Sequence, residues 1–363
     1  MVIEIANKEI DLKDELKRLV ITNLLNSFRM GCHIIVFEDE ILEEISKSEH
    51  FGTNEKKYAI QLKSKKRYFF HSIKSFKYKV IVDFNNEDSN IKNDCYSINV
   101  SYKYFSDYSS IKPITLLTED KMDAKFYKII LNFYNKVIVK NDFNISFEDY
   151  PGGGDRTKYC FEDFKNKNTL CLCLLDNDKK HPKGPKGQTI SKFSDDDFSL
   201  SKTVLSYDIG VHELENLIPC YIINKVLESA KKGEYTSHQI ETFDILKAIF
   251  NKNIEAKKYF DYKLGITSKN VFKWDDLYGE FWFPIISGFV KNDCLISKKC
   301  TCQSECKVLH GFSANLLEKS IIILSSESMG NLKKNIPQNV LDIWINIGKI
   351  LLEWSCSLEK VRC

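Results

Sequence analysis

The hydrophobic positions in the first third of the chain follow two kinds of spacing. Apolar side chains recur at helical intervals between residues 13 and 28, which predicts an amphipathic helix. Three short apolar or alternating runs predict strands, with two short helices between the first two runs. These runs lie at residues 33–40, 78–85 and 96–105. The mixture predicts an α/β N-terminal domain over residues 1–115.

The middle of the chain repeats strand and helix patterns at the spacing of a βαβ unit. A helix is predicted over residues 118–136, with Thr118 as its N-cap. The following segments predict a strand at 143–150, a glycine-rich loop at 151–157, a short helix at 158–166, a strand at 169–178, and a later strand that enters a helix near Glu215. We therefore expect a parallel sheet in a domain over residues 116–230. A mainly helical C-terminal region should follow over residues 231–363.

Two aspartates stand at the exit of the strand predicted at 169–178. The segment from Thr169 to Leu175 is continuously apolar or small, as in a strand covered on both faces, and Asp176 and Asp178 follow it. Ligands bind at the carboxyl ends of the strands in open α/β sheets. Two neighbouring carboxylates repel each other unless a cation neutralises them, so this pair predicts a hard divalent metal, Mg²⁺ or Mn²⁺. The alternative is that Asp-Asn-Asp forms only a turn.

Further acids stand at two other predicted strand ends. Glu148 closes the predicted strand at 143–150, while Glu213 and Glu215 lie at a strand-to-helix junction. Parallel strands should bring Glu148 and Asp176 to one edge of the sheet. A carboxylate cluster of this kind holds Mg²⁺ and the phosphate of a substrate, which favours metal-dependent hydrolysis of a phosphodiester.

Two neighbouring loops could bind the substrate of such a site. Glycines 152–154 let the backbone approach a ligand closely, and a basic loop follows the aspartates. The candidate substrate-binding residues are Gly152, Gly153, Gly154, Lys179, Lys180 and His181. The alternatives are a purely conformational glycine turn and a solvated charged loop.

The order of these motifs resembles the TOPRIM fold over residues 140–230, and most closely the TOPRIM domains of overcoming-lysogenization-defect type nucleases of bacterial anti-phage systems. The resemblance implies a TOPRIM-like parallel sheet core and Mg²⁺- or Mn²⁺-dependent cleavage of DNA or RNA. It also implies a partner protein such as an ATPase. By this resemblance Glu148 is the catalytic glutamate, Asp176 and Asp178 are the metal-binding pair, and Glu213 or Glu215 is the later acid. Two alternatives remain: a non-catalytic sensor or partner protein with a decayed core, and a metal-dependent phosphatase acting on a small substrate.

The composition says more about the surface charge and cellular location of the protein than about the reaction at a site. The net charge of +3 over 363 residues excludes a generally basic surface, so contacts with nucleic acid must come from local patches. No apolar run reaches the roughly 20 residues needed to span a bilayer, and the first residues are too acidic for a signal peptide. We expect a cytoplasmic protein that does not enter a membrane.

The cysteines predict a second kind of metal site. The segment from 294 to 310 carries four cysteines and a histidine, the ligand types of tetrahedral Zn²⁺. They are Cys294, Cys300, Cys302, Cys306 and His310. The irregular spacing leaves unligated thiols as the alternative.

A weaker pattern lies in the N-terminal domain. There Glu38 and Asp39 follow a predicted strand, as the metal-binding acids of PIN-like domains do. An ordinary strand followed by an acid-capped helix accounts for the same residues and is the reading we favour.

Overall fold

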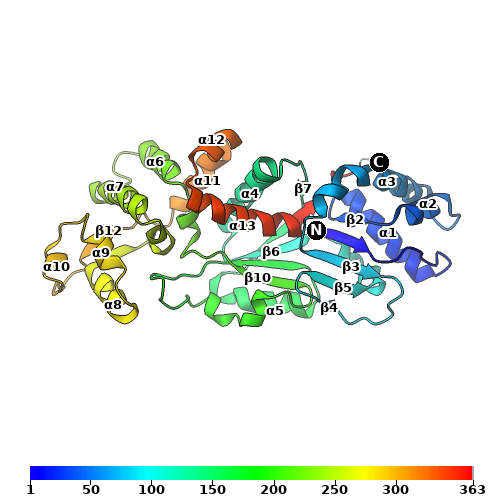
Figure 1. Ribbon diagram of the computed structural model, residues 1–363, viewed down its shortest axis with the longest axis horizontal. Helices are drawn as coiled ribbons and strands as arrows, with labels where there is room; N and C mark the ends of the chain where they lie inside the picture. Colours follow the sequence, from blue (N-terminus) through cyan, green and yellow to red (C-terminus); the bar gives the residue numbers. More distant parts are fainter. Residues whose placement is uncertain (362–363) are drawn as a thin grey trace.

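The computed structural model describes residues 1–361 and places two sheets side by side, with a smaller helical lobe beyond the second sheet (Figure 1). The chain is mixed α/β with parallel sheets and a helical C-terminal region, as the sequence predicts at this level of detail. Within the described residues, no helix combines the length and apolar character that crossing a membrane requires.

The first sheet belongs to the N-terminal part of the chain and has the order β2-β1-β3-β5-β4, parallel except for β4. Its strands are β1 (Val2–Ile5), β2 (Ile34–Val36), β3 (Lys79–Asp83), β4 (Lys92–Asn93) and β5 (Ser97–Ser101). The helices are α1 (Glu15–Met30), α2 (Asp39–Lys47) and α3 (Thr53–Ile73). The predicted helix over 13–28 is confirmed as α1. Of the two helices expected as short, α3 has 21 residues.

The second sheet forms the centre of the molecule and is entirely parallel, with the order β10-β9-β6-β8. Its strands are β6 (Ile114–Thr118), β8 (Phe147–Pro151), β9 (Cys171–Leu175) and β10 (Val204–Asp208). Helix α5 (Thr157–Asn166) covers one face, and α4 (Lys121–Phe133) covers the other together with α13 (Gln338–Ser355) (Figure 1).

The apolar run in β9 has a simple cause. Leu172 and Leu174 face the α4 side, whereas Cys171, Cys173 and Leu175 face the α5 side, and all are buried. Because both faces of this strand are covered, polar and apolar residues do not alternate along it. The prediction of a buried strand here is therefore confirmed.

Strand β6, like β1, is not among the strands predicted from the sequence. Thr118 was expected to cap a helix, but it is the last residue of β6, and Asp120 caps α4 instead through the backbone N–H of Met122. The π-helical turn Tyr134–Val139 extends α4. Because β6 lies between β8 and β9, it is a central strand of the sheet that carries the acidic residues.

The C-terminal helices return the chain to the sheets. Helix α6 (Cys220–Ser229) is followed, after the distal lobe, by α11 (Leu316–Ser326), α12 (Met329–Asn335) and α13. Trp344 of α13 packs on Phe126 and Phe133 of the α4 helix, and its indole N–H donates to the Leu217 carbonyl oxygen at 3.0 Å. Beyond α13, β13 (Cys356–Ser357) pairs with β7 (Asn144–Ile145).

We use the name distal lobe for the segment from α7 to β12, which lies beyond the central sheet (Figure 1). Its elements are α7 (Ser237–Lys252), β11 (Gly265–Thr267), α8 (Ser268–Tyr278), α9 (Trp282–Ile286), α10 (Asp293–Ile296) and β12 (Lys307–His310). Strands β11 and β12 form an antiparallel pair, and the connection from α10 to β12 has no helix or strand.

Candidate active site

Acidic residues gather where β6, β9 and β10 end. Glu119 directly follows β6, and Asp176 and Asp178 follow β9. The loop after β10 carries Glu213 and Glu215, the latter in a short 3₁₀ helix, η7 (Leu214–Leu217). Since these strands are parallel neighbours, their carboxyl ends share one edge of the sheet.

Backbone hydrogen bonds join the loops after β9 and β10. The N–H groups of Asn177 and Asp178 donate to the carbonyl oxygens of Val211 and His212, both at 3.0 Å. The Leu214 N–H donates to Asp176 Oδ2 at 3.2 Å. Asp178 has a left-handed backbone with φ of 55°, which is uncommon outside glycine and is concentrated at functional sites.

Asp123 joins the cluster from the first turn of α4. Its carboxylate accepts a hydrogen bond from the Asp120 N–H at 2.8 Å, and together the two aspartates form the capping box of the helix. Burial raises the pKa of Asp123 to about 6. Neither Asp123 nor Glu119 was among the site residues proposed from the sequence.

The acids raise one another's pKa values. Burial and the neighbouring charges of Asp178 and Asp123 raise the pKa of Glu119 to about 7. The pKa of Asp176 is raised well above its ordinary value, first by burial and then by its acidic neighbours, among them Asp123 and Glu119. Such mutual repulsion between ionised groups marks a place where a cation would be stabilised.

Two buried carboxylate oxygens in this cluster lack a hydrogen bond, although one of them, Glu215 Oε1, lies 3.7 Å from Lys263 Nζ. Glu119 Oε1 and Glu215 Oε1 are buried and accept no hydrogen bond. An unpaired buried polar oxygen is costly, and oxygen atoms are the ligands that Mg²⁺ and Mn²⁺ take. The residues present therefore fit a divalent cation. Because Mg²⁺ keeps several water ligands, the carboxylates need not all touch it directly.

Two groups of side chains among residues 1–361 already have their ligand atoms within 4.8 Å of one another, and each could hold a metal ion. One comprises His212, Glu213 and Asp261, and the other comprises four cysteines. Glu119, Asp123 and Asp176 form no third group of that kind within the described residues. Their connection is the mutual repulsion that raises their pKa values.

The group around Glu213 is already well supplied with protein donors. The Tyr262 N–H donates to Glu213 Oε1 at 2.6 Å, and Lys263 Nζ lies 3.2 Å from Glu213 Oε2 and 3.7 Å from Glu215 Oε1. Lys180 Nζ donates to Asp261 Oδ2 at 2.8 Å. Burial alone would raise the pKa of Asp261, but hydrogen bonds from His212 and Lys180 bring it below the ordinary value. These contacts indicate a network that joins the distal lobe to the acidic edge.

Glu148 does not lie at this edge, so the expectation that it would meet Asp176 there is wrong. It pairs with Thr115, which also pairs with Cys171, so Glu148 lies at the level of the first residue of β9. Five positions separate Cys171 from Asp176, about 16 Å along a strand. The predicted strand over 143–150 is in fact two: β7 pairs with β13, and β8 begins only at Phe147. Glu148 thus starts a strand that it was expected to end, and it is exposed.

The three glycines lie beside Glu119. The Gly152 N–H donates to the Thr118 carbonyl oxygen at 2.7 Å, and the Gly153 N–H donates to the Glu119 carbonyl oxygen at 3.0 Å. Gly153 and Gly154 both have positive φ angles, which favour glycine. The run therefore has a conformational cause, and it also shapes the loop next to the acids.

The basic loop after β9 is mostly engaged with the protein itself. His181 is 2% exposed, and its Nε2 lies 2.9 Å from the Gly279 carbonyl oxygen of the distal lobe. This burial leaves it unavailable for the phosphate contact expected of it. Lys179 Nζ donates to the Pro182 carbonyl oxygen, and Lys180 pairs with Asp261, whereas Lys183 is exposed.

The four cysteines of the segment 294–310 come together as the spacing allowed. Their Sγ atoms lie within 4.8 Å of one another, with 3.5 Å between Cys294 and Cys302 and 3.9 Å between Cys294 and Cys306. The group comprises Cys294, Cys300, Cys302 and Cys306. His310 lies outside it, in β12, where its ring stacks on His238 with 5.2 Å between ring centroids. The prediction that His310 is a ligand of this metal site is therefore wrong.

The acids of the N-terminal domain have ordinary structural positions. Glu38 is the residue before α2, and Asp39 begins the helix and pairs with Lys66 at 2.9 Å. A strand followed by a helix with acids at its start is what the favoured interpretation predicts, but the Glu38 side chain makes no capping hydrogen bond.

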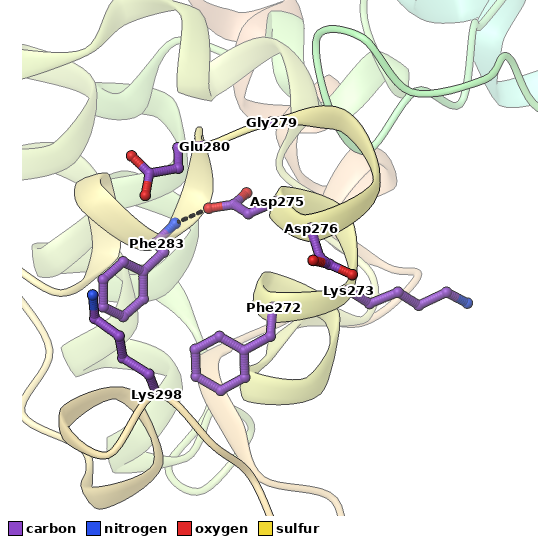
Figure 2. Close-up of a pocket in the computed structure, with 8 residues that line it drawn as sticks. All are labelled: Phe272, Lys273, Asp275, Asp276, Gly279, Glu280, Phe283 and Lys298. Atoms are coloured by element: carbon purple, nitrogen blue, oxygen red, sulfur yellow. Dashed lines mark hydrogen bonds between the residues drawn. The ribbon is translucent and has the colours of Figure 1, made fainter.

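Figure 2 shows a separate pocket of about 610 Å³ on the distal lobe. Phe272 and Phe283 form an aromatic wall, with 6.1 Å between ring centroids, and Lys298 Nζ lies 5.0 Å from the centre of the Phe283 ring. Asp275 accepts hydrogen bonds from the Trp282 and Phe283 N–H groups, which holds the start of α9. The lining contains none of the acids of the sheet edge, so this pocket is separate from the acidic cluster.

Comparison with known proteins adds no identification. No family model matches the chain, and neither a curated protein nor a solved structure gives a significant match.

The raised pKa values predict how stability depends on pH and metal. Folding raises the pKa of Glu119 from 4.5 to about 7, so between these values the folded protein holds more protons than the unfolded chain. In chelator the free energy of unfolding should therefore fall as the pH rises through this window. A divalent ion binds the ionised carboxylates, so saturating Mn²⁺ should raise the melting temperature by more degrees at about pH 8 than at about pH 5.5. Thermal melts with and without Mn²⁺ check this, and an equal gain at both pH values would contradict it.

Proposed function

We propose that this chain is a Mg²⁺- or Mn²⁺-dependent nuclease that hydrolyses phosphodiester bonds at the acidic edge of the central sheet. The observation that carries the proposal is the cluster of Glu119, Asp123, Asp176 and Glu215, in which two buried carboxylate oxygens accept no hydrogen bond. Acids that raise one another's pKa at the carboxyl ends of adjacent parallel strands are suited to a divalent metal and a phosphate.

We also propose that the central domain is TOPRIM-like. Its support is the parallel sheet with acids after β6 and β9, the latter in the Asp176-Asn177-Asp178 pattern that carries the resemblance. The glutamate that shares the edge with this pair is Glu119 and not Glu148. In this proposal Glu119 therefore takes the role that the resemblance gave to Glu148.

The residues have separate roles in the proposed reaction. Glu119, Asp176 and Asp178 would hold the metal, and Asp123 and Glu215 would complete its surroundings, directly or through water. When bound, the metal supplies a nucleophile at neutral pH and stabilises the charge that develops on the phosphoryl and leaving oxygens. Hydrogen bonds from Leu214 and from the joined loops keep Asp176 and Asp178 in place before substrate arrives.

Nucleic acid is the proposed substrate because lysines lie on or beside the loops that carry the acids. Lys183 is exposed on the loop after β9, and the Lys263 side chain is 48% exposed while it pairs with Glu213. Such lysines can contact phosphates without reading the base sequence. The role of an anti-phage effector with an ATPase partner rests on the TOPRIM resemblance.

For the four cysteines we propose zinc. Zinc–sulfur bonds of about 2.3 Å in a tetrahedron place the sulfurs roughly 3.8 Å apart, and the observed separations of 3.5 and 3.9 Å lie close to this value. The site is proposed to be structural because all four ligand positions are protein thiols.

The proposed activity is tested on the full chain with a panel of single- and double-stranded DNA, RNA, tRNA and a small phosphate monoester. We expect cleavage of at least one nucleic acid with Mg²⁺ or Mn²⁺ and none in chelator. Hydrolysis of the monoester alone would replace the nuclease by a phosphatase. If neither substrate class is cleaved with either metal, the non-catalytic alternative is favoured.

A further inference from the structure

The four-cysteine cluster adjoins the antiparallel β11–β12 pair. Cys306 directly precedes β12, its carbonyl oxygen accepts a hydrogen bond from the Ser268 N–H at 2.9 Å, and its Sγ lies 3.1 Å from Ser268 Oγ. Lys269 Nζ donates to the Cys302 carbonyl oxygen at 3.2 Å. Residues 268 and 269 begin α8, immediately after β11. A metal held by the thiols would therefore fix the end of β11 against the start of β12.

The same strand pair leads directly to the acidic edge. The residues before β11 include Tyr262, whose N–H donates to Glu213, and Lys263, which pairs with Glu213 and Glu215. Beyond β12 the Phe312 N–H donates to the Tyr262 carbonyl oxygen at 2.6 Å. The chain before β11 and the chain after β12 therefore meet at residues 262 and 263.

At Gly311 the chain after β12 lies very close to the backbone of the segment before β11. A Cβ atom at Gly311 would lie 2.3 Å from the Lys263 carbonyl oxygen, and one at Gly265 would lie 2.2 Å from the Leu309 carbonyl oxygen. At such short distances any residue other than glycine would force the backbone to shift. The position of Lys263 is therefore set by the strand that leaves the cysteine cluster.

We propose that a zinc ion bound by Cys294, Cys300, Cys302 and Cys306 acts as a clamp: through β12 and Gly311 it positions Tyr262 and Lys263 on Glu213 and Glu215. The segment between α10 and β12 has no helix or strand of its own, so metal binding supplies the order that its sequence lacks. This inference rests on the zinc site proposed above and not on the reaction at the acidic edge.

Hydrogen–deuterium exchange of the full chain, with zinc measured in the same samples, tests the clamp. In Cys302→Ser we expect loss of zinc and about tenfold faster exchange at residues 213–217 and 261–264, with the N-terminal sheet unchanged. In Gly311→Ala we expect zinc to stay bound and the same two segments to exchange faster. Gly288→Ala is the matched control in the same lobe, because its nearest neighbour would be 3.9 Å away.

A double substitution separates positioning from general loosening. Lys263→Met should speed exchange at 213–217 about tenfold in the wild-type background and add little in Cys302→Ser, because there the ion pair is already lost. Absence of zinc from the wild-type protein would overturn the proposal. So would faster exchange confined to residues 291–310, or full additivity of the two substitutions. None of these readouts depends on nuclease activity, so the clamp and the proposed reaction can fail separately.

Discussion

Replacing Asp176 by asparagine should lower divalent-dependent cleavage at least about a thousandfold, which corresponds to roughly 4 kcal/mol of transition-state stabilisation. The asparagine oxygen can still accept the hydrogen bond that Asp176 Oδ2 takes from the Leu214 N–H, so the loops should keep their positions. What is lost is a negative charge at the point where the acids raise one another's pKa. Asp176→Asn should also melt at a higher temperature than wild type in chelator at pH 8, since one buried repulsion is gone.

The matched control is Glu148→Gln. It removes a carboxylate that the sequence proposed as catalytic but that the structure places on the exposed start of β8. Cleavage rates on the best substrate of the panel, with saturating Mn²⁺, compare the variants Asp176→Asn, Glu119→Gln and Glu148→Gln. We expect the first two to lose activity and the third to keep it. Activity that survives in Asp176→Asn but disappears in Glu148→Gln would reverse the assignment.

Replacing Cys300 or Cys302 by serine should produce the largest loss of stability, several kcal/mol in the distal lobe. Within residues 291–306 the large apolar side chains are Leu295, which is buried, and Ile296, which is 75% exposed. The burial of one large apolar side chain is too little to order this lysine-rich segment. The thiol–metal bonds must therefore supply the remaining free energy of ordering.

Wild-type protein purified without chelators should contain about one zinc per chain, and either serine variant should contain almost none. Cys95→Ser is the matched control, because Cys95 is an exposed thiol of the N-terminal domain. Elemental analysis and thermal melts give the two readouts. Zinc-free wild-type protein that melts at the same temperature as Cys302→Ser would exclude a structural metal.

The sequence was most informative where a strand is buried on both faces. The continuous run before Asp176 predicted β9 and placed Asp176 and Asp178 at its end. The four cysteines could be grouped from their nearness along the chain. In both cases the residues that form the feature lie close together in the sequence, so the local pattern is enough to predict it.

Strand β6 is not among the predicted strands because its apolar pattern is short and its last residue, Thr118, also fits the N-cap of the helix that follows. The strand has only three large apolar residues, Ile114, Leu116 and Leu117, and the helix predicted from Thr118 includes Glu119. This short pattern, followed by Asp120 as a cap and by an amphipathic helix, is that of a strand-to-helix junction. Reading it in this way would have added Glu119 and Asp123 to the acidic cluster.

Other positions depend on contacts that no local pattern contains. Glu148 lies at a strand start because β7 pairs with a segment more than 200 residues away, which separates it from β8. His181 is buried by its contact with Gly279 of the distal lobe. His310 is drawn from the cysteines by its pairing in β12 and its stacking on His238. Register and long-range packing decide all three.

The central claim is that the acids after β6 and β9 bind a divalent cation, and a calorimetric titration with Mn²⁺ tests it most directly. Wild type, Glu119→Gln and Glu148→Gln are compared at pH 8 with zinc already saturated. We expect equal binding by wild type and Glu148→Gln, and binding at least about tenfold weaker by Glu119→Gln, whose buried Oε1 accepts no hydrogen bond. Undiminished binding by Glu119→Gln together with lost binding by Glu148→Gln would contradict the account.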